Sequence, residues 1–201
     1  MGLPAQKHKM TLEDFLAWEA EQPERWEFFN GEAFMMAGGS DVHNVVTGNM
    51  YMALRIGLQH TRCNVFMSDV RLRLAESDDL FYPDVFVTCT DADRARRQVK
   101  EDPILIAEVL SPSTEAHDRG LKFTAYRRLA SLREYLLIHP DSREVQLFRR
   151  GADGLFTLHD LSGQAEVACE SIGCRVSAAE LFDGLDALPG EAPTEGALPP
   201  A

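Results

Sequence analysis

The sequence predicts an α+β fold in which a mixed β-sheet is flanked by helices. One observation is the order of the segments, which reads helix, hairpin, helix, several strands, helix and several strands. A second is the run 104–110, Ile-Leu-Ile-Ala-Glu-Val-Leu, which is apolar on both faces apart from its glutamate, as in a central strand covered on both sides. The length of 201 residues favours one domain.

The amino-terminal elements carry strong local signals. A helix is expected over 11–20, because Thr11 and Asp14 have the spacing of a capping box. A hairpin is expected over 25–36, where Asn-Gly separates two apolar runs and tolerates the positive φ angles of a tight turn. A second helix is expected over 41–60, because apolar residues recur there at helical spacing.

The rest of the chain is predicted to be rich in strands. They are expected near 63–74, 82–89, 103–110, 134–139, 144–149 and 155–160, with a last pair within 165–176. Between and after them the sequence predicts an Arg- and Asp-rich loop over 91–102, a helix over 115–130 and a short helix over 178–182.

The ends of the chain differ from its middle in composition and charge. We expect a flexible leader over 1–10, a single domain over 11–186 and a disordered tail, rich in Pro, Gly, Ala and Glu, over 187–201. The net charge of −12 disfavours nucleic acid as a partner, since polyanions attract basic surfaces. The interior acids could nevertheless sit on a metal ion, which would cancel part of that charge.

The four cysteines do not have the spacing of a metal site. They are Cys63, Cys89, Cys169 and Cys174. We expect four reduced thiols. The sequence also has no apolar run near the ~18–20 residues of a membrane span and no apolar segment of a secretory signal near its start. These observations predict a cytoplasmic protein.

Glu108 is the anomaly of the sequence, because it interrupts the apolar run of a predicted central strand. Leaving it buried and unpaired has a cost on the order of several kcal/mol. It is therefore expected to be protonated, to pair with a base or to bind a cation. Asp84 follows Pro83 at the start of the preceding predicted strand. If the two strands pair, the carboxylates come close together and need a counter-charge, which Mg²⁺ can supply. Alone, Asp84 could equally cap a turn.

Lys122 offers a cation on the helix that follows Glu108. Asp118, Lys122 and Tyr126 are four residues apart in turn, so they share one helical face. Two acids, a lysine and a metal ion form a chemical set that can activate water and stabilise a phosphodiester transition state. The alternative is that Lys122 only pairs with Asp118 on the same helix.

These residues resemble the PD-(D/E)XK nuclease superfamily, with Pro83-Asp84 as its first element and Glu108 as the acid of its second. The lysine usual two residues after that acid is replaced by Leu110. The pattern is similar to the Uma-type family of restriction-endonuclease-like proteins, in which the helix supplies the lysine. The matching segments are Trp26–Glu32, His43, Glu108–Thr114, Asp118, Lys122, Tyr126 and Glu134-Tyr135.

The resemblance implies a restriction-endonuclease-like core and a Mg²⁺- or Mn²⁺-dependent DNA endonuclease. Asp84 and Glu108 would hold the metal, with the carbonyl of Val109 as a further ligand, and Lys122 would stabilise the transition state. The candidate accessory residues are Glu32, His43, Asp118 and Tyr126. A homodimer is expected, because twofold symmetry suits the cutting of both strands of a duplex.

Other interpretations remain open at the level of sequence. The chain could be a nuclease-fold binding or assembly module with weak or lost catalysis, which need not bind metal. The two acids could be a glycosidase-type pair, which needs neither metal nor lysine. Glu27 is expected to form a structural ion pair, His43 could be a surface or capping residue, and Glu32 could be a solvated turn acid.

Overall fold

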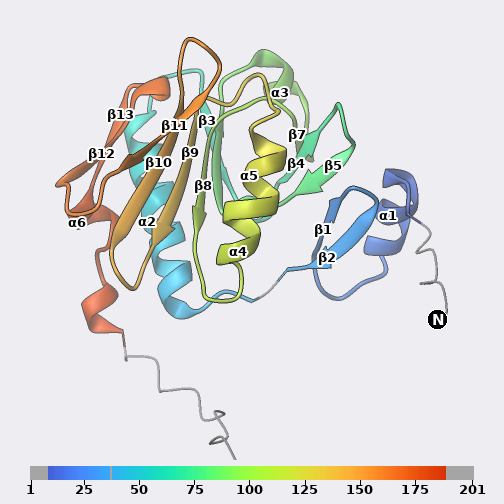
Figure 1. The fold of residues 1–201 in the computed structure, drawn as a ribbon, viewed down its shortest axis with the longest axis horizontal. Coiled ribbons are helices and arrows are strands. Elements are labelled where there is room, and N and C mark those ends of the chain that lie inside the picture. The colour runs from blue at the N-terminus through green and yellow to red at the C-terminus, as the bar shows by residue number, and fades with distance from the viewer. Residues whose placement is uncertain (1–8, 37, 189–201) are drawn as a thin grey trace, which may run out of the picture.

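The computed structural model describes residues 9–36 and 38–188 and is drawn in Figure 1. A six-stranded mixed sheet forms its centre. In spatial order its strands are β11 (Phe156–Asp160), β10 (Glu144–Arg150), β9 (Glu134–His139), β8 (Pro103–Val109), β6 (Val85–Thr88) and β3 (Asn64–Met67). The pair β8–β9 is parallel and its neighbours are antiparallel. The predicted mixed sheet is confirmed.

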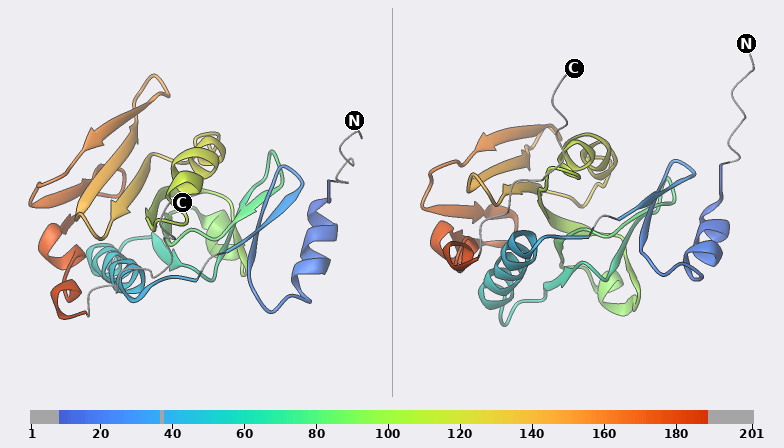
Figure 2. Two further views of the ribbon diagram at one scale, coloured as in Figure 1. Left: turned by 60° about the horizontal axis from the view of Figure 1, so that its bottom comes forward. Right: turned by 90° about the horizontal axis from the view of Figure 1, so that it is seen from below.

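Two smaller sheets accompany the central one. The five-stranded sheet contains, in order, β2 (Glu32–Met35), β1 (Trp26–Phe29), β5 (Asp79–Phe81), β4 (Arg71–Leu74) and β7 (Val99–Lys100). The two-stranded sheet pairs β12 (Glu166–Cys169) with β13 (Cys174–Ser177). Helix α1 (Leu12–Glu19) packs beside the β1–β2 hairpin at one end of the molecule, and α6 (Ala178–Leu181) lies at the other end (Figure 2).

Strand β8 is covered on both faces, as its apolar sequence predicts. Alternate residues such as Leu105 and Val109 join the core cluster that includes α2 (Asp41–Gly57). Ile106 joins the opposite cluster, which includes Tyr126 of the helical segment after β8. Because side chains alternate along a strand, Glu108 shares the face of Ile106 and points toward that segment.

The helix predicted over 115–130 is shorter and less regular than expected. It consists of α4 (Glu115–His117), a π-helical turn η1 (Asp118–Lys122) and α5 (Phe123–Tyr126). A π-helical turn is rare and often marks a functional site. The wider turn still keeps the side chains of Asp118 and Lys122 in contact.

The segment 91–102 is not the loop that its charge predicted. It contains the short helix α3 (Asp91–Ala95) and strand β7. Buried Asp93 organises the segment, because its carboxylate accepts backbone hydrogen bonds from Glu101 and Asp102. The strand predicted over 63–74 is divided into β3 and β4 by a turn at 68–70, and β5 separates that region from β6.

The prediction of four reduced thiols is wrong, because Cys63 and Cys89 form a disulfide. The antiparallel pairing of β3 with β6 sets Asn64 opposite Thr88, which brings the next residues outward, Cys63 and Cys89, opposite each other. Their Cα atoms are 4.1 Å apart. No spacing in the sequence reveals this register. Cys169 and Cys174 are free and buried.

The predicted leader and tail fall largely outside the described residues, at 1–8 and 189–201. The two described residues of the leader contact the hairpin turn, since Lys9 donates to the side chain of Asn30 and Met10 to the backbone of Gly31. A short 3₁₀ helix (Leu185–Ala187) extends to the predicted start of the tail. None of the helices within the described ranges has the length and apolar character needed to cross a bilayer.

Candidate active site

Asp84 and Glu108 are brought together by the pairing of β6 with β8. The register sets Val85 opposite Ala107, so Asp84 lies beside Glu108 at the end of the ladder. Each carboxylate accepts a backbone hydrogen bond from the other strand's side of this pair, because the amide of Asp84 donates to Glu108 Oε2 at 3.1 Å and that of Val109 donates to Asp84 Oδ2 at 2.8 Å. The two acids are therefore fixed in position by the backbone of the central sheet.

Lys122 joins the acids from the π-helical turn. Its Nζ lies 3.2 Å from one carboxylate oxygen each of Glu108, Asp118 and Glu27. The hydroxyl of buried Tyr126 donates to Glu108 Oε1 at 3.1 Å. The helical face predicted from sequence is thus directed at Glu108, and Lys122 is shared among three acids instead of pairing with Asp118 alone.

His43 contacts the other acid from the first turn of α2. Its Nε2 lies 3.1 Å from Asp84 Oδ2, and Ser40 caps the helix by accepting from the backbone of His43. Gly39 leaves room for the ring, because a Cβ atom at that position would lie 2.9 Å from His43 Nδ1. The imidazole therefore contacts Asp84 and also lies near the helix start.

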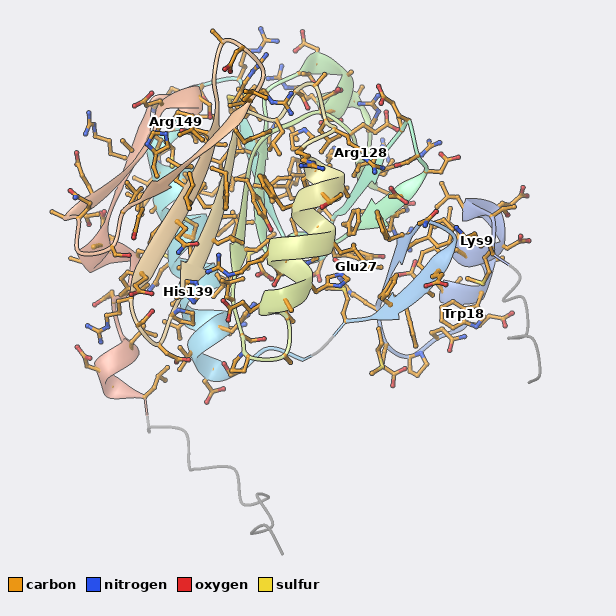
Figure 3. All side chains as sticks on the ribbon, in the orientation of Figure 1. Lys9, Trp18, Glu27, Arg128, His139 and Arg149 are labelled. Carbon is orange, nitrogen blue, oxygen red and sulfur yellow. A yellow bond between two sulfur atoms is a disulfide. The ribbon has the colours of Figure 1, made fainter. Side chains whose placement is uncertain are left out.

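Two residues of the site were not predicted as such. Glu27 forms the ion pair that was expected of it, but its partner is Lys122, and His117 Nε2 lies 3.3 Å from its other oxygen. In the sequence, the feature that could have identified Glu27 as a site residue is its position among the aromatic residues of a predicted strand. His117 carried no signal, because it stands one residue outside the Asp118–Lys122–Tyr126 pattern. Figure 3 shows Glu27 between the β1–β2 hairpin and the α4–α5 segment.

Glu32 does not belong to this cluster, which corrects its assignment as an accessory residue. It is exposed and lies beside the hairpin turn, at the end of β2 opposite to Met35. Met35 lines the cavity of the site, whereas Glu32 does not. The solvated turn acid was the better interpretation of this residue.

A cavity of about 240 Å³ opens over the cluster. Its polar lining consists chiefly of Glu27, His43, Asp84, Glu108, His117, Asp118 and Lys122. Among the lining residues in the described ranges, Lys122 is the only lysine or arginine. The cavity is therefore strongly acidic around one buried ammonium group.

Burial, together with this excess of acid, raises the pKa of Glu108. Burial raises the pKa of Glu108 well above its usual range, and although the charge of Lys122 opposes this, the charges of Asp84 and Asp118 raise it further. Burial alone would lower the pKa of Lys122, but Glu108 and Glu27 outweigh it and hold that pKa well above its ordinary value. Lys122 is accordingly charged, and Glu108 ionises less readily than an exposed glutamate.

Asp84 behaves in the opposite way. Burial raises its pKa, but the hydrogen bond and charge of His43, the charge of Lys122 and the amide of Val109 outweigh burial and lower it. The cavity thus holds one carboxylate that favours ionisation beside one that resists it. Neighbouring carboxylates whose pKa values are shifted in opposite directions are common where acid–base or metal chemistry takes place.

The donor set fits a divalent cation that retains much of its water. No group of three or more His, Cys, Asp and Glu side chains in the described part of the chain is arranged as a metal cage. Mg²⁺ does not need one, since it commonly binds through one or two carboxylates and completes its shell with water and substrate oxygens. Asp118 Oδ1 is buried, and its counter-charge is the Lys122 ammonium at 3.2 Å, which Glu27 and Glu108 share, so negative charge is left without full compensation.

The arrangement of helices, sheet and paired acids defines a restriction-endonuclease-like protein. A crystal structure of a putative nuclease belonging to DUF820 from Anabaena variabilis ATCC 29413 superposes with a TM-score of 0.71, over 86% of this chain and 97% of that one. The two are 17% identical, so the likeness establishes the fold.

Residues 12–177 match the Uma2 family, described as "Putative restriction endonuclease", and the chain belongs to that family. Two relatives come from Synechocystis sp. (strain ATCC 27184 / PCC 6803 / Kazusa). The uncharacterized protein slr1290 is 34% identical over 177 residues, which cover 88% of this chain and 93% of the relative. The uncharacterized protein sll1609 is 36% identical over 158 residues, which cover 77% and 89% respectively.

Proposed function

We propose that this protein is a metal-dependent phosphodiesterase that cleaves DNA, as its family description suggests. The observation that supports the proposal most directly is the convergence of Asp84, Glu108 and Lys122 in one acidic cavity. Each comes from a different element, and the backbone of the central sheet fixes the two acids relative to each other.

Asp84, Glu108 and the carbonyl of Val109 would hold Mg²⁺ or Mn²⁺. When bound, the ion would neutralise charge on a phosphodiester oxygen and lower the pKa of a water nucleophile. Lys122, kept charged by its acidic neighbours, stabilises the negative charge that develops in the transition state. Its contacts with Glu27 and Asp118 restrict the position of the ammonium group.

The remaining accessory residues act by positioning. Tyr126 fixes Glu108 Oε1 through its hydroxyl, and His43 holds Asp84 Oδ2. In the described residues, the other oxygen of Asp84 accepts no hydrogen bond, and Asp84 lines the cavity. That oxygen is the one available for a cation.

A binding or assembly module explains the cavity less well. A scaffold gains little from a buried acid with a raised pKa, because well-packed apolar residues are commonly as stable as buried ions or more so. A glycosidase-type pair is also disfavoured, since the chemistry of such a pair assigns no task to Lys122, which lies 3.2 Å from Glu108.

The test is cleavage of supercoiled plasmid and of single-stranded DNA with Mg²⁺, with Mn²⁺ and with chelator. We expect activity only with metal and its loss in Asp84→Asn, Glu108→Gln and Lys122→Met. Lys100→Met is the matched control, because Lys100 is also buried but donates to the backbone carbonyls of Asp93 and Arg96, outside the cavity.

Cleavage that survives chelation, or that survives all three site substitutions, would overturn the proposal. Equal loss in Lys100→Met and Lys122→Met would attribute the effect to folding and contradict the role of Lys122. The expected homodimer stays a prediction, which sedimentation analysis can test. So does the cytoplasmic location, against which the Cys63–Cys89 bond weighs, because disulfides persist mainly in oxidising compartments.

A further inference from the structure

The cavity over the acids has a second wall of a different chemical kind. Phe34, Met35 and Met36, at the end of β2, line it together with His117. Met35 is 61% exposed, and Phe34 is only half-buried. The Phe34 ring thus faces the acidic groups across a space of about 240 Å³. Met35, the next residue of the strand, projects from the opposite face of β2, and Met36 packs against the cluster under α1.

The register of the hairpin directs Phe34 into the site. Phe34 lies opposite Glu27 in the β1–β2 ladder, so both side chains project from the same face. The Phe34 ring lies 5.5 Å from the His117 ring, and His117 in turn contacts Glu27. Because Glu27 pairs with Lys122, the apolar wall is joined to the reacting groups by direct contacts.

Phe34 differs from the other aromatic residues of the hairpin region in its surroundings. Phe28 is buried and stacks on Phe15 at 4.8 Å, and Trp26 packs edge-on against Trp18. Within the described residues, the aromatic partner of Phe34 is His117 alone. The helix α1 core therefore accounts for Phe28 and Trp26, and Phe29 packs against Phe81, while Phe34 remains available at the cavity.

The charges around the cavity limit how a nucleic acid can be held there. Lys122 is the only lysine or arginine among the described lining residues, and Glu27, Asp84, Glu108 and Asp118 surround it. A protein that binds a duplex through its phosphates needs many basic contacts, and its affinity falls steeply with salt. This cavity offers one cation for a phosphate and an apolar surface for something else.

A nucleobase fits that surface. Bases stack on aromatic side chains irrespective of sequence, and such stacking supports single-strand binding. In a duplex the bases are stacked inside and the phosphates lie outside, so a base next to a phosphate at Lys122 could reach Phe34 only after leaving its pair. An unpaired nucleotide can place its phosphate and its base on the two walls together.

We propose that Phe34 forms a base-stacking wall, and that the preferred substrate is a single-stranded nucleic acid with an unpaired base beside the scissile phosphate. The inference rests on the proposed function for the phosphate, but its binding component can be measured without catalysis. Phe34 is a substrate-contacting residue, and His117 positions it.

The test is fluorescence anisotropy in chelator with a labelled single strand of about 12 nucleotides, within the ~4–16 nucleotides that single-strand sites span. The matching duplex and an RNA strand of the same sequence are the other arms. We expect the DNA single strand to bind about 10- to 100-fold more tightly than the duplex, the equivalent of unpairing one base. The logarithm of affinity should fall with the logarithm of salt with a slope of about −0.7, as for one phosphate of a single strand, against about −5 to −9 for a protein that neutralises about 6–10 duplex phosphates.

Substitutions separate stacking from general instability. Phe34→Ala should weaken single-strand binding about 5- to 150-fold, as for one stacked base, and Phe34→Trp should restore it. Met52→Ala is the matched control, because Met52 is 60% exposed but lies on α2, outside this cavity.

The outcomes distinguish this inference from the proposed function. Single-strand binding that needs Phe34, without cleavage in Mg²⁺ or Mn²⁺, supports the wall and contradicts the nuclease. Cleavage of duplex that is unaffected by Phe34→Ala supports the nuclease and overturns the wall. Equal effects of Phe34→Ala and Met52→Ala, or an absence of binding to every strand, also overturn it. Tighter binding of the RNA strand than of the DNA strand would support stacking on Phe34 and identify RNA as the preferred nucleic acid.

Discussion

Two buried glutamates on neighbouring parallel strands have opposite surroundings. Glu134 begins β9 and is fully buried, and hydrogen-bond donors surround its carboxylate. Arg149 Nε donates to it at 2.9 Å, the amides of Glu170 and Ser171 at 3.1 and 3.0 Å, and the Ser171 hydroxyl at 2.5 Å. Glu134, Arg149 and Ser171 thus form a structural clamp that joins the central sheet to the segment between β12 and β13.

Glu108 on β8 is equally buried but shares its one cation. Lys122 also forms ion pairs with Glu27 and Asp118, and Asp84 lies beside Glu108. Burial and these acids raise the pKa of Glu108 well above its usual range. Burial of a carboxylate is therefore not itself a sign of function. Incomplete compensation of its charge, at the lining of a cavity, is what separates the candidate site from the structural clamp.

The largest expected effect is on the clamp. Glu134→Gln should lower the free energy of unfolding by about 3–5 kcal/mol, because it leaves the Arg149 guanidinium and its neighbours without their buried anion. Urea denaturation measures this change. Glu170→Gln removes another carboxylate from Arg149 at an exposed position and should cost less than about 1 kcal/mol. Equal losses would refute the contrast between a buried and an exposed partner.

A smaller effect on stability is expected at the site. Glu108→Gln should change the free energy of unfolding by no more than about 1 kcal/mol, because it removes an acid whose ionisation its neighbours already oppose, and functional sites commonly trade stability for activity. The same urea series measures it. A loss as large as that of Glu134→Gln would show that Glu108 is a structural residue after all.

The smallest effect is a change in thiol labelling beside the clamp. Burial raises the pKa of Cys169, and the charge of Glu134 raises it further. Because the thiolate is the reactive form, a raised pKa slows alkylation near pH 8. Glu134→Gln should lower this pKa and accelerate labelling of Cys169, as mass spectrometry of native protein would show.

Cys174 is the internal reference for that experiment. Burial raises its pKa as well, but its charged neighbour is Glu180 and not Glu134. Global opening would accelerate both thiols together, whereas the local electrostatic effect is confined to Cys169. Parallel acceleration of the two would contradict the assignment to Glu134.

The sequence was informative where one strand or helix carried the whole signal. An acid in a doubly covered strand identified Glu108, and helical spacing identified Lys122 and Tyr126. Contacts between segments far apart in the chain were not accessible in this way. The pairing of Glu27 with Lys122 depends on how the hairpin packs against the π-helical turn, and the Cys63–Cys89 bond depends on a strand register.

Calorimetric titration of Mg²⁺ into the metal-free protein measures the proposed metal site without any substrate. We expect binding to the wild-type protein, its loss in Asp84→Asn and Glu108→Gln, and its near-complete retention in Lys122→Met. Retained binding in both acid variants, or an equal loss in all three, would contradict the roles assigned to these side chains.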